Sequence, residues 1–326
     1  MRAAVMHAYG DPGVLVAEDV PDPVPTAEMV RVDLHASALN WHDCLVRQGL
    51  YGSPLPHVPG ADGAGVRHDT GEEVIVAPSL WWGDRPQAPG PRWEILGDHR
   101  WGTLAESVLV PADVLLPRPS GWSWEQAAAL PLVGMTVYRA LVTRGRLRAG
   151  ENLLVLGAGG GVATMATELA AALGAQVWVT HGSPEKLAHA VAAGARDAGS
   201  YREPDWAVTA RAASPDGAGF DRMLDSVGSW PQALTTLRPG GRLVVLGAAR
   251  SNDQLLQARP FYFGQFDLLG TAMGTTAELA AVLRLVEDGG LGPPAIAAAY
   301  DLDRASDAHR HLEAGQTIGK VVVRTR

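Results

Sequence analysis

A glycine-rich turn at residues 157–161 is the feature of this sequence with the clearest chemical use. The apolar run 153–156 leads into Gly157-Ala158-Gly159-Gly160-Gly161, and a helical run over residues 162–173 follows. Glycines let a backbone turn tightly and approach a pyrophosphate, whose charge then lies against the free N–H groups of the helix N-terminus. The order strand, glycine turn and helix predicts a dinucleotide site, with Ala163 where the strict pattern has a last glycine.

The end of the next strand, residues 176–180, indicates which dinucleotide is bound. A site for NAD usually has Asp or Glu here, against the ribose 2′-hydroxyl, but this chain continues Thr180-His181-Gly182-Ser183. No carboxylate in this stretch would repel a 2′-phosphate, and Ser183 and Lys186 can bind one through a hydrogen bond and a charge. The sequence thus predicts NADP(H), the alternative being that Lys186 is an ordinary solvated helix residue.

The chain contains a single cysteine, Cys44. One cysteine excludes an internal disulfide and any zinc site built from several cysteines, which fits a reducing compartment. A metal site made of His42, His57 and Asp62 is conceivable, but packing in the core or on the surface explains these residues better. We therefore predict no metal site.

The elements that must position these residues change in kind along the chain. Residues 2–7, 29–37, 72–77 and 104–110 are short runs rich in Val, Leu and Ala, separated by Pro, Gly and Asp, and predict a mostly β half. From about residue 150, apolar strands alternate with amphipathic helices. That alternation is typical of a parallel sheet covered on both faces.

The composition restricts the partners. The chain has 326 residues, enough for two domains of roughly 100–200 residues each. Its formal charge of −8 opposes binding to nucleic acid or anionic lipid. No run approaches the roughly 20 apolar residues that span a bilayer, and Gly10-Asp11-Pro12-Gly13 comes too early for the apolar core of a signal peptide. We expect a cytoplasmic protein whose partners are small molecules or copies of itself.

Several short motifs, each weak alone, occur in a specific order over nearly the whole chain. They are Ala38-Leu39-Asn40-Trp41-His42-Asp43, Arg47-Gln48-Gly49, Pro59-Gly60-Ala61-Asp62-Gly63, Ala128-Ala129-Leu130-Pro131, Thr136, the glycine turn, Asp225-Ser226-Val227-Gly228, Pro239-Gly240-Gly241-Arg242 and Gly319-Lys320-Val321-Val322. The set resembles the medium-chain dehydrogenases/reductases, and most closely their zinc-independent quinone oxidoreductases. The resemblance implies an α/β fold: a discontinuous GroES-like β-rich catalytic domain (1–118 and 271–326) and a Rossmann domain with a doubly wound parallel sheet (119–270). It also implies a homodimer.

The resemblance bears on zinc as well. In the zinc alcohol dehydrogenases of that family a Cys, a His and a second Cys hold the catalytic zinc, and those positions correspond here to Asn40, Ala61 and Leu132. Ala and Leu offer no donor and a neutral amide is a weak one. Residues 80–101, where a structural zinc would be bound, contain no cysteine. The resemblance and the cysteine count thus both predict a zinc-independent protein.

Without a Lewis acid, nothing strong holds the alkoxide of an unactivated alcohol. We therefore predict NADPH-dependent reduction of a quinone or an α,β-unsaturated carbonyl, in which hydrogen-bond donors stabilise charge on a conjugated oxygen. The candidate catalytic donors are Asn40, Arg47, Tyr51 and Thr136. A tyrosine considered as proton donor in that branch corresponds to Leu45 here, so the proton donor is left open, with solvent as one source.

The cofactor contacts follow partly from the glycine turn and partly from the resemblance, which implies Tyr201 near the adenosine phosphate and residues 245–248 near the nicotinamide half. The predicted cofactor-binding residues are Thr136, Gly157, Gly160, Gly161, Val162, Ala163, Thr180, Ser183, Lys186, Tyr201, Val227, Leu246, Gly247, Ala248 and Met273. Five of the ten tryptophans, at positions 41, 81, 82, 93 and 101, are candidates to line an apolar acceptor pocket.

Two other functions are compatible with the sequence. One is an alcohol or aldehyde dehydrogenase that works without zinc. The other is an NADPH-binding protein with little catalysis, as in some crystallin relatives of that family. An acceptor panel, alcohol oxidation and ligand binding distinguish the three.

Overall fold

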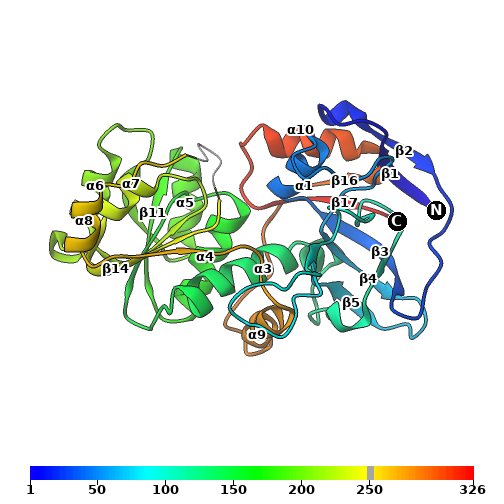
Figure 1. The fold of residues 1–326 in the computed structure, drawn as a ribbon, viewed down its shortest axis with the longest axis horizontal. Coiled ribbons are helices and arrows are strands. Elements are labelled where there is room, and N and C mark those ends of the chain that lie inside the picture. Colours follow the sequence, from blue (N-terminus) through cyan, green and yellow to red (C-terminus); the bar gives the residue numbers. More distant parts are fainter. Residues whose placement is uncertain (248–252) are drawn as a thin grey trace. The chain divides into compact units, whose positions relative to one another are not determined.

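The structure, a computed structural model, describes residues 1–247 and 253–326 (Figure 1). The chain divides into two compact units: residues 1–135 with 274–326 form the first unit, and residues 136–273 the second. The first division lies at residue 135 and not at 118, because helix α2 (Trp124–Ala128) packs against strands β3 (Val30–Ala38) and β4 (Asp62–Arg67) of the first unit. The predicted cofactor residue Ala248 lies outside the described residues.

The first unit is built on a seven-stranded sheet, in which β8 pairs with β3 beside the path β16-β17-β3-β4-β5-β9. Its strands are β3 (Val30–Ala38), β4 (Asp62–Arg67), β5 (Glu73–Val76), β8 (Ser107–Val110), β9 (Leu115–Pro117), β16 (Ile296–Asp301) and β17 (Lys320–Arg324). Two small sheets accompany it: β1 (Arg2–Met6) with β2 (Leu15–Asp19), and β6 (Ser79–Leu80) with β7 (Glu94–Ile95). The predicted mostly β half is thus confirmed.

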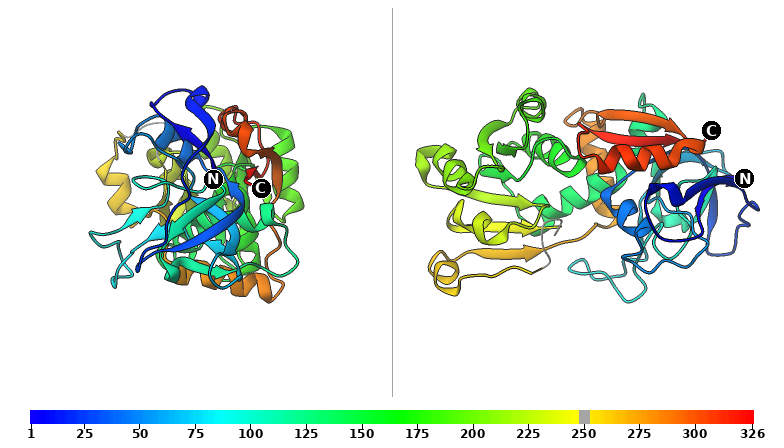
Figure 2. Two further views of the ribbon diagram at one scale, coloured as in Figure 1. Left: turned by 90° about the vertical axis from the view of Figure 1, so that its right-hand side faces the viewer. Right: turned by 90° about the horizontal axis from the view of Figure 1, so that it is seen from above.

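The C-terminal strand belongs to this unit because β17 pairs antiparallel with β3, Val322 lying opposite Ala38. It lies between β16 and β3 in the sheet, and Figure 2 draws it in red beside the orange strand β16. The helices of the unit are α1 (Trp41–Arg47), α2, α9 (Thr276–Glu287) and α10 (Ala305–Glu313), and α3 (Pro131–Tyr138) spans the division between the units. Helix α10 packs against both β17 and α1.

The second unit contains a six-stranded parallel sheet in the order β12-β11-β10-β13-β14-β15. Its strands are β10 (Asn152–Val155), β11 (Gln176–His181), β12 (Arg196–Ser200), β13 (Phe220–Asp225), β14 (Leu237–Val245) and β15 (Asp267–Gly270). The helices are α4 (Gly161–Ala172), α5 (Pro184–Ala192), α6 (Trp206–Ala213), α7 (Trp230–Thr235) and α8 (Ala258–Phe263). This is the predicted doubly wound Rossmann sheet.

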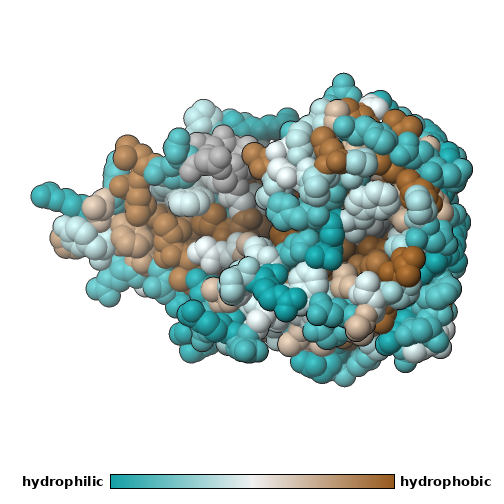
Figure 3. Space-filling model, turned by 45° about the vertical axis from the view of Figure 1, so that its right-hand side comes forward, coloured by the Kyte–Doolittle hydropathy of each residue, from teal (hydrophilic) through white to brown (hydrophobic). Residues whose placement is uncertain are grey.

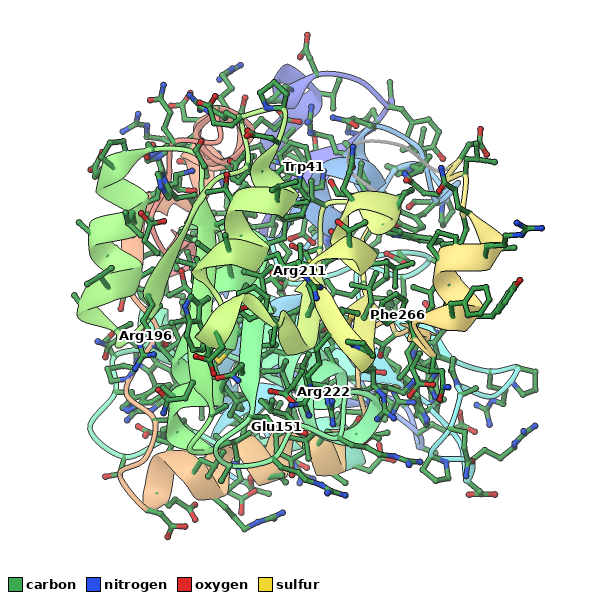
Figure 4. The ribbon with its side chains drawn as sticks, turned by 90° about the vertical axis from the view of Figure 1, so that its left-hand side faces the viewer. Trp41, Glu151, Arg196, Arg211, Arg222 and Phe266 are labelled. Carbon is green, nitrogen blue, oxygen red and sulfur yellow. The ribbon has the colours of Figure 1, made fainter. Side chains whose placement is uncertain are left out.

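This strand order decides where a ligand can bind. The chain moves outward from β10 through β11 to β12 and then returns to β13 on the other side of β10. Ligands of such sheets bind outside the carboxyl ends of the strands, at the point where the order reverses. An ion pair between Glu151 and Arg222 (2.9 Å), labelled in Figure 4, joins β10 and β13 near the amino ends of these strands.

Among the described residues no helix is long and apolar enough to cross a membrane.

Candidate functional site

The glycine turn lies at the carboxyl end of β10 and opens helix α4. Gly157 has φ +104°, in the left-handed region that glycine favours, and its N–H donates to Thr180 Oγ at 3.0 Å. Gly160 is the N-cap of α4 and has open space on its Cβ side. The first turn of α4, with Gly161, Val162 and Ala163, therefore starts beside space that a pyrophosphate can fill, and its N–H groups suit an anion.

Lys186 lies directly over this turn. A Cβ placed on Gly159 would approach Lys186 Cγ to 2.7 Å, so the lysine stem packs on the glycine backbone. Ser183 caps α5, its hydroxyl accepting the N–H of Lys186 at 3.4 Å. The structure thus brings the two features that the sequence identified separately, the glycine turn and the Ser183–Lys186 pair, to one place.

Thr180 and Tyr201, two of the predicted cofactor-binding residues, lie in different surroundings. Thr180 is fully buried and its hydroxyl accepts the Gly157 N–H, so it supports the turn from within instead of facing a ribose. The Tyr201 hydroxyl lies where a Cβ on Gly182 would be, which places the ring over the end of β11. A residue that the sequence did not suggest is Asp197, on the neighbouring strand, whose carboxylate is 3.3 Å from His181 Nε2.

The ends of β13 and β14 form one tight turn system. The buried Asp225 carboxylate accepts the N–H groups of Val227, Gly228 and Ser229 at 2.6–2.8 Å. A Cβ on Gly247 would overlap the carbonyl oxygen of Ser226. Gly247 is therefore required by contact with the chain itself, a reason that differs from the predicted approach to nicotinamide.

An apolar hollow of about 430 Å³ lies at the ends of β14 and β15. It is lined by Trp230, Val245, Leu246, Gly247, Leu268, Leu269, Gly270 and Thr271. Met273 follows it, buried and with φ +52°, a strained conformation for a residue other than glycine. The hydroxyl of Thr136 is buried without a hydrogen-bond partner among the described residues. An orphan hydroxyl, an open helix N-terminus and a lysine over the turn fit a dinucleotide cofactor.

In the first unit, Asn40 belongs to a buried polar cluster. Its Nδ2 donates to Asp62 Oδ2 at 2.9 Å and to the Ala38 carbonyl at 3.4 Å. Lys320 Nζ donates to Asn40 Oδ1 at 2.5 Å and to Asp62 Oδ2 at 3.2 Å, and the Leu132 N–H donates to Asp62 Oδ1 at 2.7 Å. Both amide hydrogens of Asn40 are used inside the protein, so these contacts do not support its predicted role as a donor to an acceptor.

Arg47 is also committed to the interior. Its guanidinium is buried, forms an ion pair with Glu313 of α10 and donates to the Gly10 carbonyl at 2.7 Å. The prediction that Arg47 donates to an acceptor is therefore not supported, because its charge holds α1 against α10. Beside it, Cys44 is fully buried, and burial raises the pKa of its thiol to about 12.

A pair that the sequence did not predict lies at the start of α1. His42 Nε2 is 2.5 Å from Asp98 Oδ1, and the His42 ring centre is 4.6 Å from that of Tyr51. Burial opposes the charged imidazolium, but the hydrogen bond and charge of Asp98 outweigh it, and the pKa of His42 is raised. Tyr51, another predicted catalytic residue, is 38 % exposed.

The tryptophans of residues 81–101 pack largely on their own segment. Trp82 and Trp93 meet edge to face at 5.9 Å, and Trp93 Nε1 donates to Ser79 Oγ at 2.8 Å. Arg92 and Arg100 each lie over the Trp81 ring. These contacts explain three of the rings without an acceptor.

Comparison with known proteins finds a family match for a large part of each unit. Residues 26–120 match the family described as "Alcohol dehydrogenase GroES-like domain", and residues 161–288 the family described as "Zinc-binding dehydrogenase". The chain is 33 % identical to a quinone oxidoreductase of Pseudomonas aeruginosa over 97 % of each chain. It is 37 % identical to a solved NAD-dependent alcohol dehydrogenase, with a TM-score of 0.93 and 99 % of each chain covered.

A further relative is much longer. The pikromycin polyketide synthase component PikAII of Streptomyces venezuelae is 34 % identical over 93 % of this chain, which spans 8 % of that protein. The fold, the two family matches and the near-full-length relatives agree with the resemblance seen in the motifs. The chain belongs to the medium-chain dehydrogenase/reductase superfamily. It is an oxidoreductase of that type, from a family that binds a nicotinamide cofactor.

Proposed function

We propose that this protein reduces a quinone or an α,β-unsaturated carbonyl with NADPH and without zinc. The observation that carries the proposal is the cluster around Asp62. The positions that correspond to zinc ligands hold Asn40, whose amide oxygen already accepts from Lys320, and the side chains of Ala61 and Leu132, which have no donor. Two of these positions offer no ligand and the third offers a weak one, which supports a protein without catalytic zinc, and the Lys320 ammonium already balances the Asp62 carboxylate.

The choice of acceptor follows from that donor set. Oxidation of a simple alcohol needs a strong electrophile to hold the alkoxide, whereas a conjugated carbonyl is already polarised. When bound, the reduced nicotinamide supplies a hydride. The chain's own contribution is to bind the dinucleotide at the glycine turn, to exclude water and to supply a proton.

NADPH is proposed over NADH because Lys186 lies on the glycine turn, next to the capping Ser183. Its ammonium and the Ser183 hydroxyl suit a 2′-phosphate. Asp197 is the carboxylate that the sequence did not suggest, and it lies 3.3 Å from His181 Nε2.

The test is turnover with matched substrate panels. We expect NADPH oxidation by quinones and enones, slower NADH oxidation, and purified protein without stoichiometric zinc. Oxidation of alcohols in preference to reduction of these acceptors would favour a zinc-less alcohol dehydrogenase, the second candidate, to which the 37 % identical solved enzyme points. Tightly bound zinc in a one-to-one ratio would contradict the proposal.

A further inference from the structure

We propose that His42 is the proton donor to the carbonyl oxygen of the acceptor, and that Asp98 is its positioning residue. The inference rests on the proposed function. Asp98 holds Nε2 at 2.5 Å, and Nδ1 makes no hydrogen bond to any described residue. The imidazole is thus fixed through one nitrogen, while the other is left to carry a transferable proton.

Several other donors of the first unit are bonded within the protein or deeply buried. Asn40 has both amide hydrogens bonded within the protein, and Arg47 is ion-paired with Glu313. His57 is buried and bonded to the Gly97 carbonyl, and burial lowers the pKa of His309 to about 3. His42 combines a carboxylate partner with a partly exposed side chain, of which 13 % is accessible.

The surroundings of His42 suit a flat, conjugated acceptor. Trp41, which starts α1 and is labelled in Figure 4, is 48 % exposed, and Tyr51 packs against the His42 ring with a partly exposed ring of its own. Aromatic faces bind planar rings by offset or edge-to-face packing. A quinone or enone packed on the exposed part of the Tyr51 ring would lie beside the imidazole.

The acceptor carbon gains a hydride from the reduced nicotinamide, and the π electron pair of the conjugated system moves to the carbonyl oxygen. The Nδ1–H bond of protonated His42 breaks and an O–H bond forms, which leaves neutral imidazole and an enol. Solvent returns the proton to His42, and the enol tautomerises in solvent, to the saturated ketone from an enone and to the hydroquinone from a quinone.

Charged groups around the ring set the pH dependence. Asp98 faces His42 from the loop after β7, Asp43 lies on α1 itself, and both carboxylates favour the imidazolium, while Tyr51 contributes an uncharged ring. Since the acid form must donate, kcat/KM falls as pH rises through the raised pKa of His42. Replacing Asp98 by Asn removes the charge and moves this alkaline limb to lower pH.

The experiment compares His42→Gln and Asp98→Asn with His68→Gln as the matched control, since His68 also pairs with a carboxylate, Asp33, at 2.7 Å. We expect His42→Gln to lower kcat for the best acceptor about 100-fold, to abolish the alkaline limb and to remove the solvent isotope effect. NADPH binding, measured by fluorescence, stays unchanged. Asp98→Asn shifts the limb, and His68→Gln changes none of these quantities.

The outcomes separate the two proposals. If the wild-type protein reduces acceptors but His42→Gln retains its kcat, its alkaline limb and its isotope effect, the role of His42 is wrong and the proposed function stands. A limb that stays in place in Asp98→Asn overturns the positioning role. If the wild-type protein binds NADPH and reduces no acceptor, both proposals are overturned. Circular dichroism and thermal unfolding show that each variant is folded.

Discussion

Asp43 shows how strongly burial can raise the pKa of a carboxyl. Burial raises the pKa of its carboxyl to about 6 against the pull of His42 and of its hydrogen bond from the Asn40 N–H (2.7 Å). Its Oδ1 has no hydrogen-bond partner among the described residues. Ionisation of Asp43 in the folded protein therefore costs free energy. This carboxyl is next in the chain to His42, the proposed proton donor.

This carboxyl predicts a pH-dependent stability. Below pH 3.8 the Asp43 carboxyl is protonated in both the unfolded and the folded protein. As pH rises from 3.8 to about 6 the unfolded state releases this proton first, so the free energy of unfolding falls. The loss amounts to about 3 kcal/mol. Urea unfolding between pH 4 and pH 8 should show this decline in the wild-type protein and a flatter profile in Asp43→Asn. Parallel profiles would contradict the assignment.

Asn40 is predicted to matter for stability. Asn40→Ala removes hydrogen bonds to Asp62 and Lys320, both charged and buried, and should lower the free energy of unfolding by about 2 kcal/mol. Asn152→Ala serves as the control, since the Asn152 side chain makes no hydrogen bond to a described residue. Unchanged stability together with lost turnover would restore the catalytic role that the motif suggested.

At the scale of elements, the β10–α4 and β11–α5 connections together form the proposed cofactor cradle. Lys186→Ala should lower kcat/KM for NADPH 10- to 100-fold, the loss expected for about 1.5–3 kcal/mol of charged hydrogen bonding. The value for NADH should not change. Arg196→Ala is the control because Arg196 is a cation at the amino end of β12 (Figure 4), whereas the cradle lies at the carboxyl ends of the strands. Equal losses with both cofactors would exclude a 2′-phosphate contact.

The sequence predicted these elements well because their signals are local. Apolar runs, a glycine turn and a proline at the start of α5 act within a few residues, and the strands and helices follow them. The His42–Asp98 and Arg47–Glu313 pairs join residues 56 and 266 positions apart. No periodicity encodes such contacts, so the sequence could show neither the partner of Arg47 nor the pairing of His42.

At the scale of the whole molecule, the second unit has features of a self-association surface. Strand β15 lies at the end of the strand order, and Tyr262 and Phe263 of α8 are 56 % and 75 % exposed. Figure 3 shows hydrophobic surface on this unit. Uncovered sheet edges and apolar patches commonly pair with another chain.

We therefore expect a homodimer, of twice the 34.3 kDa chain mass, in light scattering coupled to gel filtration. Phe263→Glu should shift the protein toward the monomer, because it places a charge in an apolar contact. Exposed Val24→Glu, in the first unit, is the control. A wild-type monomer would contradict the expectation, and a Phe263→Glu dimer would exclude this surface.

The pairing of β17 with β3 also affects the order in which the chain can fold. Residues 136–273 are contiguous and leave the ribosome as a complete Rossmann unit, whereas the first unit waits for residues 274–326. Until Lys320 arrives, the Asp62 carboxylate has no cation beside it, and β3 lacks its neighbour β17. The nascent chain should therefore acquire its dinucleotide-binding half first and close its β-rich half only when synthesis reaches the last strand.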